Sequence, residues 1–152
     1  MKQPTLRMQV TTRNKIGFFR LLPLLAIAVV IAGCTTPAGP VVLIDYHRTG
    51  GIAGFNDHLV IYSNGNATVT RNTGAEQFTM TPAEIRNLEG LFENAGFMAL
   101  NSSYPPSSPG ADYFTYIITY HGKTVTTEDT GVPEALAPVI STLNGIVSSH
   151  SG

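Results

Sequence analysis

The 152-residue sequence predicts an α+β domain in which a small antiparallel β-sheet of two hairpins packs against two α-helices. Runs of β-branched and aromatic residues, separated by glycine-rich turns, are typical of strands joined in hairpins. Two other segments repeat apolar residues at helical spacing. The order along the chain is strands, helix, strands, helix, which indicates an antiparallel sheet packed on two helices.

The N-terminal 33 residues are expected to be a lipoprotein signal peptide and not part of the fold. Five basic residues and no acid precede an apolar stretch, residues 21–32, that is shorter than the ~20 apolar residues of a membrane-spanning helix. The junction "IAGC" resembles the lipobox of prokaryotic lipoproteins, in which the cysteine is lipidated after cleavage. We therefore expect lipid on Cys34, a tether over residues 34–40, and one domain over residues 41–149.

The charged residues are distributed unevenly along the chain. All ten acidic residues but only four of the nine basic residues follow Cys34, which gives the domain a net charge of −6 with neutral histidines. A nucleic-acid-binding domain needs a basic patch, so we expect no nucleic-acid partner. Because Cys34 is the only cysteine, an internal disulfide is excluded. Lipid on this residue would hold the domain at the cell membrane, facing outward or in the periplasm.

Four strands are predicted before the first helix. Residues 41–48, "VVLIDYHR", and 58–63, "HLVIYS", have the composition of strands. The pair Asn64-Gly65 is a strong signal for a type I′ hairpin turn, from which residues 66–72 return. Residues 77–80, "QFTM", are expected to form a short edge strand.

The first helix has start and stop signals at both ends. Thr81 is the predicted N-cap, Pro82 occupies the first helical position, and Glu84 completes a capping box. Apolar residues then recur at helical spacing, so that one face of the helix is buried. Gly96 stands at the position where a glycine commonly ends a helix.

The second half of the domain is predicted as loop, hairpin and helix. Residues 101–112 contain three prolines and a Pro-Gly step, which favour a long irregular loop. His121-Gly122 is the predicted turn of a second hairpin, between residues 113–120 and 123–129. A short lead-in turn should precede a last helix that starts near Pro138. In the first strand of this hairpin, Phe114, Tyr116, Ile118 and Tyr120 are predicted to share one face.

The segment "YHRTGGIAGF", residues 46–55, contains three glycines within five residues. A phosphate-binding glycine loop follows a strand and opens a helix, but here the next predicted element is a strand, so nucleotide binding is disfavoured. The glycines instead suit the positive φ values of a hairpin loop. Ile52 and Phe55 either pack inward against the sheet or face outward toward a partner.

Three segments in order, "YHRTGGIAGF", "PGADYFTYIITYHGK" and "EDTGVPEALAPVISTL", resemble the emfourin family at similar spacing. The likeness covers about residues 44–146. Emfourin-like proteins are small inhibitors of thermolysin-like zinc metallopeptidases, and the named member inhibits protealysin. The resemblance therefore implies an α+β inhibitor domain whose partner is such a peptidase. These enzymes prefer a bulky apolar side chain beside the scissile bond.

Together, these features predict a membrane-anchored surface lipoprotein that inhibits thermolysin-like zinc metallopeptidases. The alternative is a non-inhibitory surface lipoprotein that serves as a protein-binding or structural module. Residues 72–76 and 101–112 are two further loops that could contact the peptidase. The first candidate contact loop consists of Gly50, Gly51, Ile52, Ala53, Gly54 and Phe55.

Polar residues around the first loop raise the question of a metal or catalytic site. Asp45, His47, Asp57 and His58 are close in sequence, and Asp45 and His47 share one strand face. Their spacing matches no recognised metal-ligand pattern, so we interpret them as solvated residues at strand ends and expect no metal or cofactor. No Gly-x-Ser-x-Gly motif occurs either, and we expect no enzymatic activity.

Overall fold

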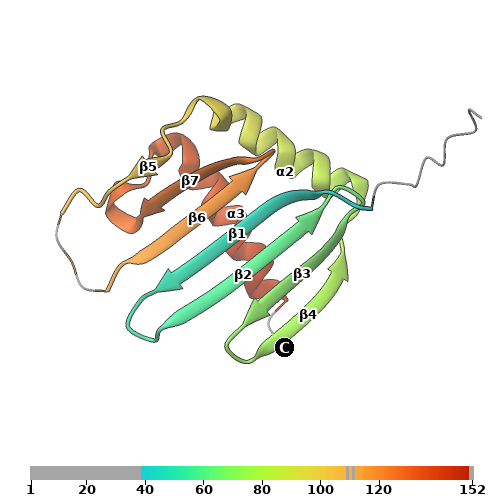
Figure 1. Cartoon of the computed structure of the whole chain (residues 1–152), viewed down its shortest axis with the longest axis horizontal. Helices are drawn as coiled ribbons and strands as arrows, with labels where there is room; N and C mark the ends of the chain where they lie inside the picture. Colours follow the sequence, from blue (N-terminus) through green and yellow to red (C-terminus); the bar gives the residue numbers. More distant parts are fainter. Residues whose placement is uncertain (1–38, 109, 111, 151–152) are drawn as a thin grey trace, which may run out of the picture. The chain divides into compact units, whose positions relative to one another are not determined.

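The computed structural model describes residues 39–108, 110 and 112–150 (Figure 1). The predicted signal peptide and Cys34 lie outside the described residues, as does most of the predicted tether. Within the described ranges, no helix has the length and apolar character needed to cross a membrane.

All strands of the described residues belong to one seven-stranded sheet, ordered β4-β3-β2-β1-β6-β7-β5. Neighbouring strands are antiparallel, except that β5 and β7 are parallel. The α+β class is confirmed, but the sheet is larger than the two predicted hairpins. The strands are β1 (Val42–Gly50), β2 (Phe55–Tyr62), β3 (Asn66–Arg71), β4 (Gly74–Thr79), β5 (Ser103–Tyr104), β6 (Phe114–Tyr120) and β7 (Lys123–Glu128).

The two halves of the sheet join through β1, which pairs with β2 on one side and with β6 on the other. Tyr46 of β1 lies opposite Leu59 on one neighbour and Ile118 on the other, and all three side chains are fully buried. Pairing in this register places the apolar sides of both halves on one face, so a single core forms instead of two small ones.

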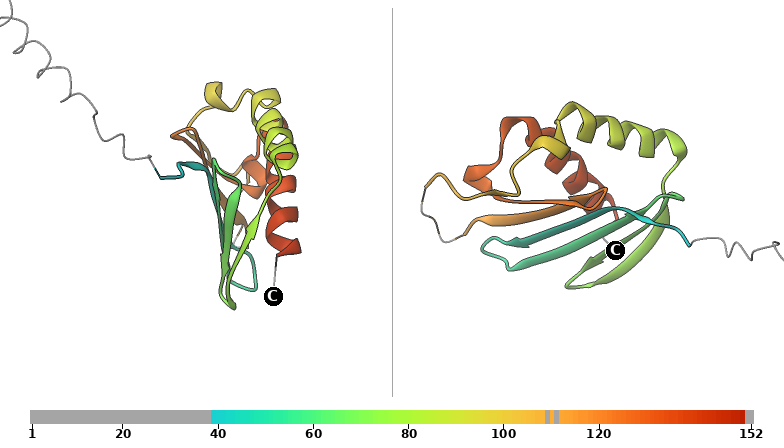
Figure 2. Two further views of the ribbon diagram at one scale, coloured as in Figure 1. Left: turned by 90° about the vertical axis from the view of Figure 1, so that its right-hand side faces the viewer. Right: turned by 45° about the horizontal axis from the view of Figure 1, so that its top comes forward.

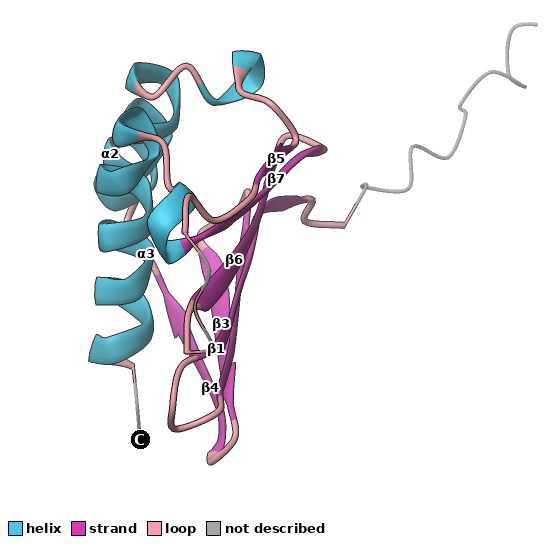
Figure 3. Cartoon of the chain, turned by 90° about the vertical axis from the view of Figure 1, so that its left-hand side faces the viewer, coloured by secondary structure: helices cyan, strands magenta, loops and turns pink. Residues whose placement is uncertain are grey.

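Both helices, α2 (Pro82–Asn94) and α3 (Ala137–Ser149), cover the same face of the sheet (Figures 2 and 3). The predicted capping box of Thr81 and Glu84 is present, and Gly96 follows α2 with a φ of +57°. A 3₁₀ turn, η3 (Glu134–Leu136), precedes α3, so the predicted lead-in turn is confirmed. The other 3₁₀ turns are η1 (Phe97–Ala99) and η2 (Asp129–Gly131).

The core lies between this sheet face and the helices. Phe92 of α2 and Leu143 of α3 are fully buried against residues from the strands. Burial of an aromatic or leucine side chain of this kind contributes about 1.5–3 kcal/mol relative to exposure. No helix of the described residues covers the opposite face of the sheet (Figure 3), which is called the open face below.

Two local predictions are corrected. Asn64 does not have the positive φ of a type I′ turn, because the loop between β2 and β3 has three residues and only Gly65, the last of them, has a positive φ (+86°). The type I′ signature instead lies at His121 (+47°) and Gly122 (+78°). Residues 101–112 were expected to be irregular throughout, but Ser103–Tyr104 forms β5 by pairing with β7.

Candidate functional site

The candidate loop joins β1 to β2 through a tight turn. Gly54 N donates a hydrogen bond to Gly51 O at 3.0 Å, which leaves Ile52 and Ala53 as the central residues of the turn. Gly51 and Gly54 have φ values of +68° and +63°, a region that residues with a side chain enter at a cost. The expectation that these glycines supply positive φ is therefore confirmed.

Ile52 projects from the tip of this loop. Its side chain is 89% exposed, more than any other large apolar side chain of the described residues. Single exposed apolar residues are common on protein surfaces. Ile52 differs from an ordinary one because the turn that carries it is held by the Gly54–Gly51 hydrogen bond and by the pairing of Gly50 with Phe55 at its base.

Phe55 has a different environment from Ile52. It is half-buried and packs edge-on against Phe114 of β6, with ring centroids 5.5 Å apart. The guanidinium carbon of Arg48 lies 5.2 Å from the centre of each ring, so a cation–π contact adds to the aromatic pair. Phe55 thus anchors the base of the loop, and Ile52 is the large apolar side chain that the loop presents outward.

The loop also packs against the start of β6 through its backbone. Gly51 N donates to Tyr113 O at 3.3 Å. A Cβ atom on Gly50 would lie 2.3 Å from the same carbonyl oxygen, and one on Gly51 would lie 2.8 Å from the Phe114 ring. These two glycines are therefore required by close approach as well as by their φ values.

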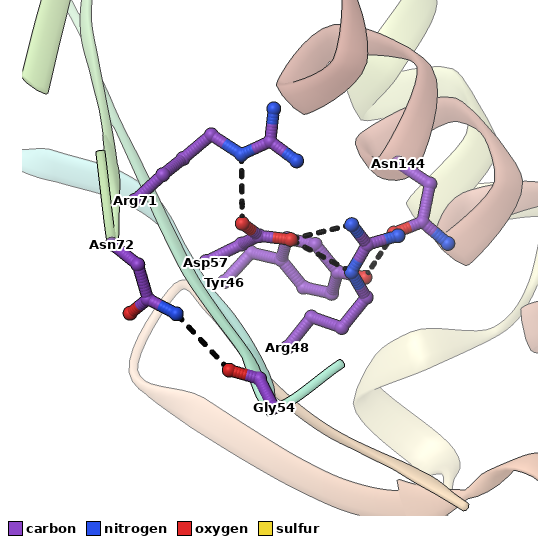
Figure 4. Close-up of polar contacts among 7 residues, drawn as sticks. All are labelled: Tyr46, Arg48, Gly54, Asp57, Arg71, Asn72 and Asn144. Atoms are coloured by element: carbon purple, nitrogen blue, oxygen red, sulfur yellow. Dashed lines mark hydrogen bonds and ion pairs between the residues drawn. The ribbon is translucent and has the colours of Figure 1, made fainter. Parts of the chain in front are cut away.

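A buried ionic group lies beneath the loop (Figure 4). Asp57 of β2 is only 1% exposed. One of its carboxylate oxygens accepts hydrogen bonds from Arg48 Nε, at 2.9 Å, and from Arg48 Nη2. The other accepts from Arg71 Nε of β3 at 2.9 Å. Charge-assisted hydrogen bonds of this kind are roughly twice as strong as neutral ones. Asp57 therefore links β1, β2 and β3 at the end of the sheet that carries the Ile52 turn.

The same group reaches helix α3 through Asn144. Its Oδ1 atom accepts hydrogen bonds from Arg48 Nη1 at 2.9 Å and from the Tyr46 hydroxyl at 2.8 Å. Burial raises the pKa of Tyr46 well above its ordinary value, which keeps the hydroxyl protonated as a donor. We call Tyr46, Arg48, Asp57, Arg71 and Asn144 the Asp57 network. It fixes the loop base relative to the sheet and to α3.

Sequence reasoning missed the Asp57 network. The interpretation of Asp57 as a solvated strand-end residue is wrong, because its carboxylate is buried and paired. A signal was present: Arg48 and Asp57 occur two residues from the core residues Tyr46 and Leu59, on the same strand faces. A charged side chain at a core-facing strand position needs a side chain of opposite charge or a hydrogen-bond partner. Only the register, in which Arg48 lies opposite Asp57, identifies that partner.

The three candidate contact loops lie at the same end of the sheet (Figure 1). Asn72, in the turn between β3 and β4, donates its side-chain N–H to Gly54 O at 3.0 Å. On the other side, Gly50 lies opposite Phe114, which follows the long loop of residues 101–112. The structure therefore places the turn between β3 and β4 and the C-terminal end of the long loop, at Asp112, beside the Ile52 turn.

The remaining polar residues around the loop lie on the opposite face of the sheet from Asp57. Asp45, His47 and His58 lie on the open face, whereas Asp57 faces the helices. Their side-chain donor atoms lie within 4.8 Å of one another. This Asp45–His47–His58 triad is the group of described residues with an arrangement suited to a metal ion, and sequence spacing did not indicate it.

Neither a protein-family model nor a curated protein sequence matches this chain.

Proposed function

We propose that this protein is a membrane-anchored inhibitor of a thermolysin-like zinc metallopeptidase, and that Ile52 is the side chain that enters the enzyme's cleft. The observation that carries the proposal is the 89% exposure of Ile52 at the tip of a braced turn. A peptidase of this class prefers a bulky apolar residue beside the scissile bond, and Ile52 is such a residue in an accessible place.

The bracing of the loop supports inhibition by a pre-organised segment. The Gly54–Gly51 hydrogen bond and the Asn72–Gly54 hydrogen bond fix the turn itself. The contact of Phe55 with Phe114 fixes its base. A loop that is already ordered loses little conformational entropy on binding, where each immobilised side chain would otherwise cost about 0.5–1.5 kcal/mol. Such a loop fits a cleft without first having to fold.

The membrane part of the proposal depends on the lipobox-like "IAGC" junction and Cys34. Acyl chains on this cysteine would hold the domain at the membrane surface, with residues 35–40 as a short spacer. An inhibitor in this position would act on secreted or surface peptidases close to the cell that carries it.

The test is a titration of thermolysin and protealysin with a soluble form that comprises residues 35–152. The rate at which each enzyme cleaves a fluorogenic peptide is the readout. Stoichiometric inhibition is expected for the unaltered sequence. Ile52→Asp should weaken inhibition by at least ~100-fold, since a charge cannot be desolvated in an apolar pocket. The matched control is Met98→Asp, because Met98 is an exposed apolar residue of η1, away from the loop.

Two results would contradict the proposal. Equal inhibition by the unaltered protein and by Ile52→Asp would exclude this turn as the contact and direct attention to residues 72–76 and 101–112. Absence of inhibition at micromolar protein would favour the alternative function, a surface lipoprotein that binds another partner. The inward packing of Phe55 is compatible with that alternative, because it leaves a small apolar surface at the loop tip.

A further inference from the structure

The open face of the sheet contains a compact group of three side chains that the inhibitory proposal does not use. His47 on β1 and His58 on β2 lie directly opposite each other, and Asp45 lies two residues before His47 on the same face. β1 and β2 are interior strands of the sheet, paired on both sides. Side chains on paired strands are held more firmly than side chains on loops.

The donor atoms of the triad converge at the spacing of metal ligands. Asp45 Oδ1 lies 3.2 Å from His47 Nε2 and 3.1 Å from His58 Nε2. A tetrahedral ion with bonds of about 2.0–2.2 Å to nitrogen and oxygen holds its ligand atoms roughly 3.3–3.6 Å apart, only slightly more than these distances. A small movement of the side chains would therefore place all three atoms around one ion.

Both histidines present their Nε2 atoms to the same carboxylate oxygen of Asp45. Their rings stack with centroids 3.8 Å apart, so two imidazolium charges would repel each other. A neutral imidazole nitrogen is the metal ligand in proteins.

We propose that Asp45, His47 and His58 bind one divalent transition-metal ion, with Zn²⁺ as the ion that best fits two imidazoles and a carboxylate. Three protein ligands leave a fourth position open, as in zinc sites that also bind water or another ligand. The side chains are 34–38% exposed, and they lie on the open face of the sheet, which no helix of the described residues covers (Figure 3). The open position therefore faces solvent, where water or a donor from a partner can fill it.

The register makes this site a link between two strands. Gly50 pairs with Phe55 across the turn, and the same register brings His47 opposite His58. An ion at the triad would connect β1 to β2 on the open face, while the Asp57 network connects them on the helix face. Because metal binding to the folded state stabilises it, Zn²⁺ should raise the melting temperature of the domain.

The experiment is a calorimetric titration of the full chain, purified in detergent and stripped with a chelator, with ZnCl₂. One ion per chain is expected. We expect His47→Gln, His58→Gln and Asp45→Asn each to weaken Zn²⁺ binding by at least ~100-fold. Mutation of a residue that only hydrogen-bonds to a metal ligand already lowers metal affinity about 10–100-fold, and these variants remove a ligand itself. The control is His121→Asn, which removes a histidine outside the triad at a positive φ that asparagine tolerates.

A second measurement needs no variant. In NMR spectra of the unaltered chain, Zn²⁺ should shift the imidazole signals of His47 and His58 and leave those of His121 and His150 unchanged. Shifts confined to the triad, with lost binding in its variants, would support the proposal. Unchanged triad signals at saturating Zn²⁺ would overturn it, as would binding that survives in His47→Gln or that disappears equally in His121→Asn.

Discussion

Replacement of Asp57 by asparagine tests whether the buried ionic group stabilises the fold. The substitution keeps the shape of the side chain but removes the charge that pairs with Arg48 and Arg71. The Arg48 side chain is only 12% exposed, and that of Arg71 is 22% exposed. Arg71 can turn toward water, but Arg48 cannot easily do so, because Phe55 and Phe114 enclose it.

The expected loss of stability follows from these contacts. Removal of one partner from a buried ion pair costs about 3–5 kcal/mol. Asparagine keeps one oxygen that still accepts a hydrogen bond, so the lower value, about 3 kcal/mol, is appropriate for Asp57→Asn. This is a large share of the 5–15 kcal/mol by which domains are typically stable.

Urea unfolding, followed by circular dichroism, measures the effect. With an m-value of about 1.5 kcal/mol/M, a loss of about 3 kcal/mol lowers the midpoint by about 2 M. Glu93→Gln serves as the control, because it removes one negative charge from an exposed position on α2, and its effect should stay within about 0.5 kcal/mol. If both variants shifted the midpoint equally, the Asp57 network would not be a major source of stability and the reasoning would be refuted.

Three further predictions concern local conformation, helix capping and pH. Gly54→Ala should destabilise the fold by about 1–2 kcal/mol, since Gly54 has a φ of +63°. Gly90 lies within α2 and has open space at its Cβ position, so Gly90→Ala should stabilise the fold by about 0.5–1 kcal/mol. Thermal unfolding of both variants checks the contrast, and a lower melting temperature in both would contradict it. Thr81→Ala should cost about 1 kcal/mol by removing the capping box of α2, and an unchanged urea midpoint would argue against that role. Burial raises the pKa of Tyr46 and of Tyr116 in the folded state. Their contribution to stability is therefore complete below the unfolded-state pKa of about 10 and is lost as the pH rises above it toward the folded-state value. Tyr46→Phe should flatten the decline of the urea midpoint at alkaline pH, and a decline identical to that of the unaltered protein would refute this.

Both helices were predictable because helical spacing of apolar residues is a local signal, and α2 also has local signals at its two ends. The capping box of Thr81 and Glu84, the proline at position 82 and the C-terminal Gly96 lie within or next to the helix that they delimit. Each signal acts through hydrogen bonds or φ preferences over a few residues. The strands were also found, because side-chain alternation requires only that one face of a strand be buried.

The turn between β2 and β3 shows where local signals were insufficient. Asn64-Gly65 is the most favourable dipeptide for a type I′ turn, yet the register of β2 and β3 leaves three residues in the loop instead of two. The apolar side chains of both strands must face the helices, and this requirement outweighs the preference of one dipeptide. The two-residue turn occurs at His121-Gly122, where the strand register requires it.

The sequence by itself determined the fold class, both helices, most strands and the glycine turn that carries Ile52. Tertiary structure decided which residues meet: the pairing of β1 with β6, the Asp57 network and the Asp45–His47–His58 triad. Arg48 and Asn144 are 96 positions apart in the chain, and they meet only when the sheet and α3 pack together. The physical reason is that periodicity and turn chemistry act over a few residues, whereas register and packing are set by burial of the whole core.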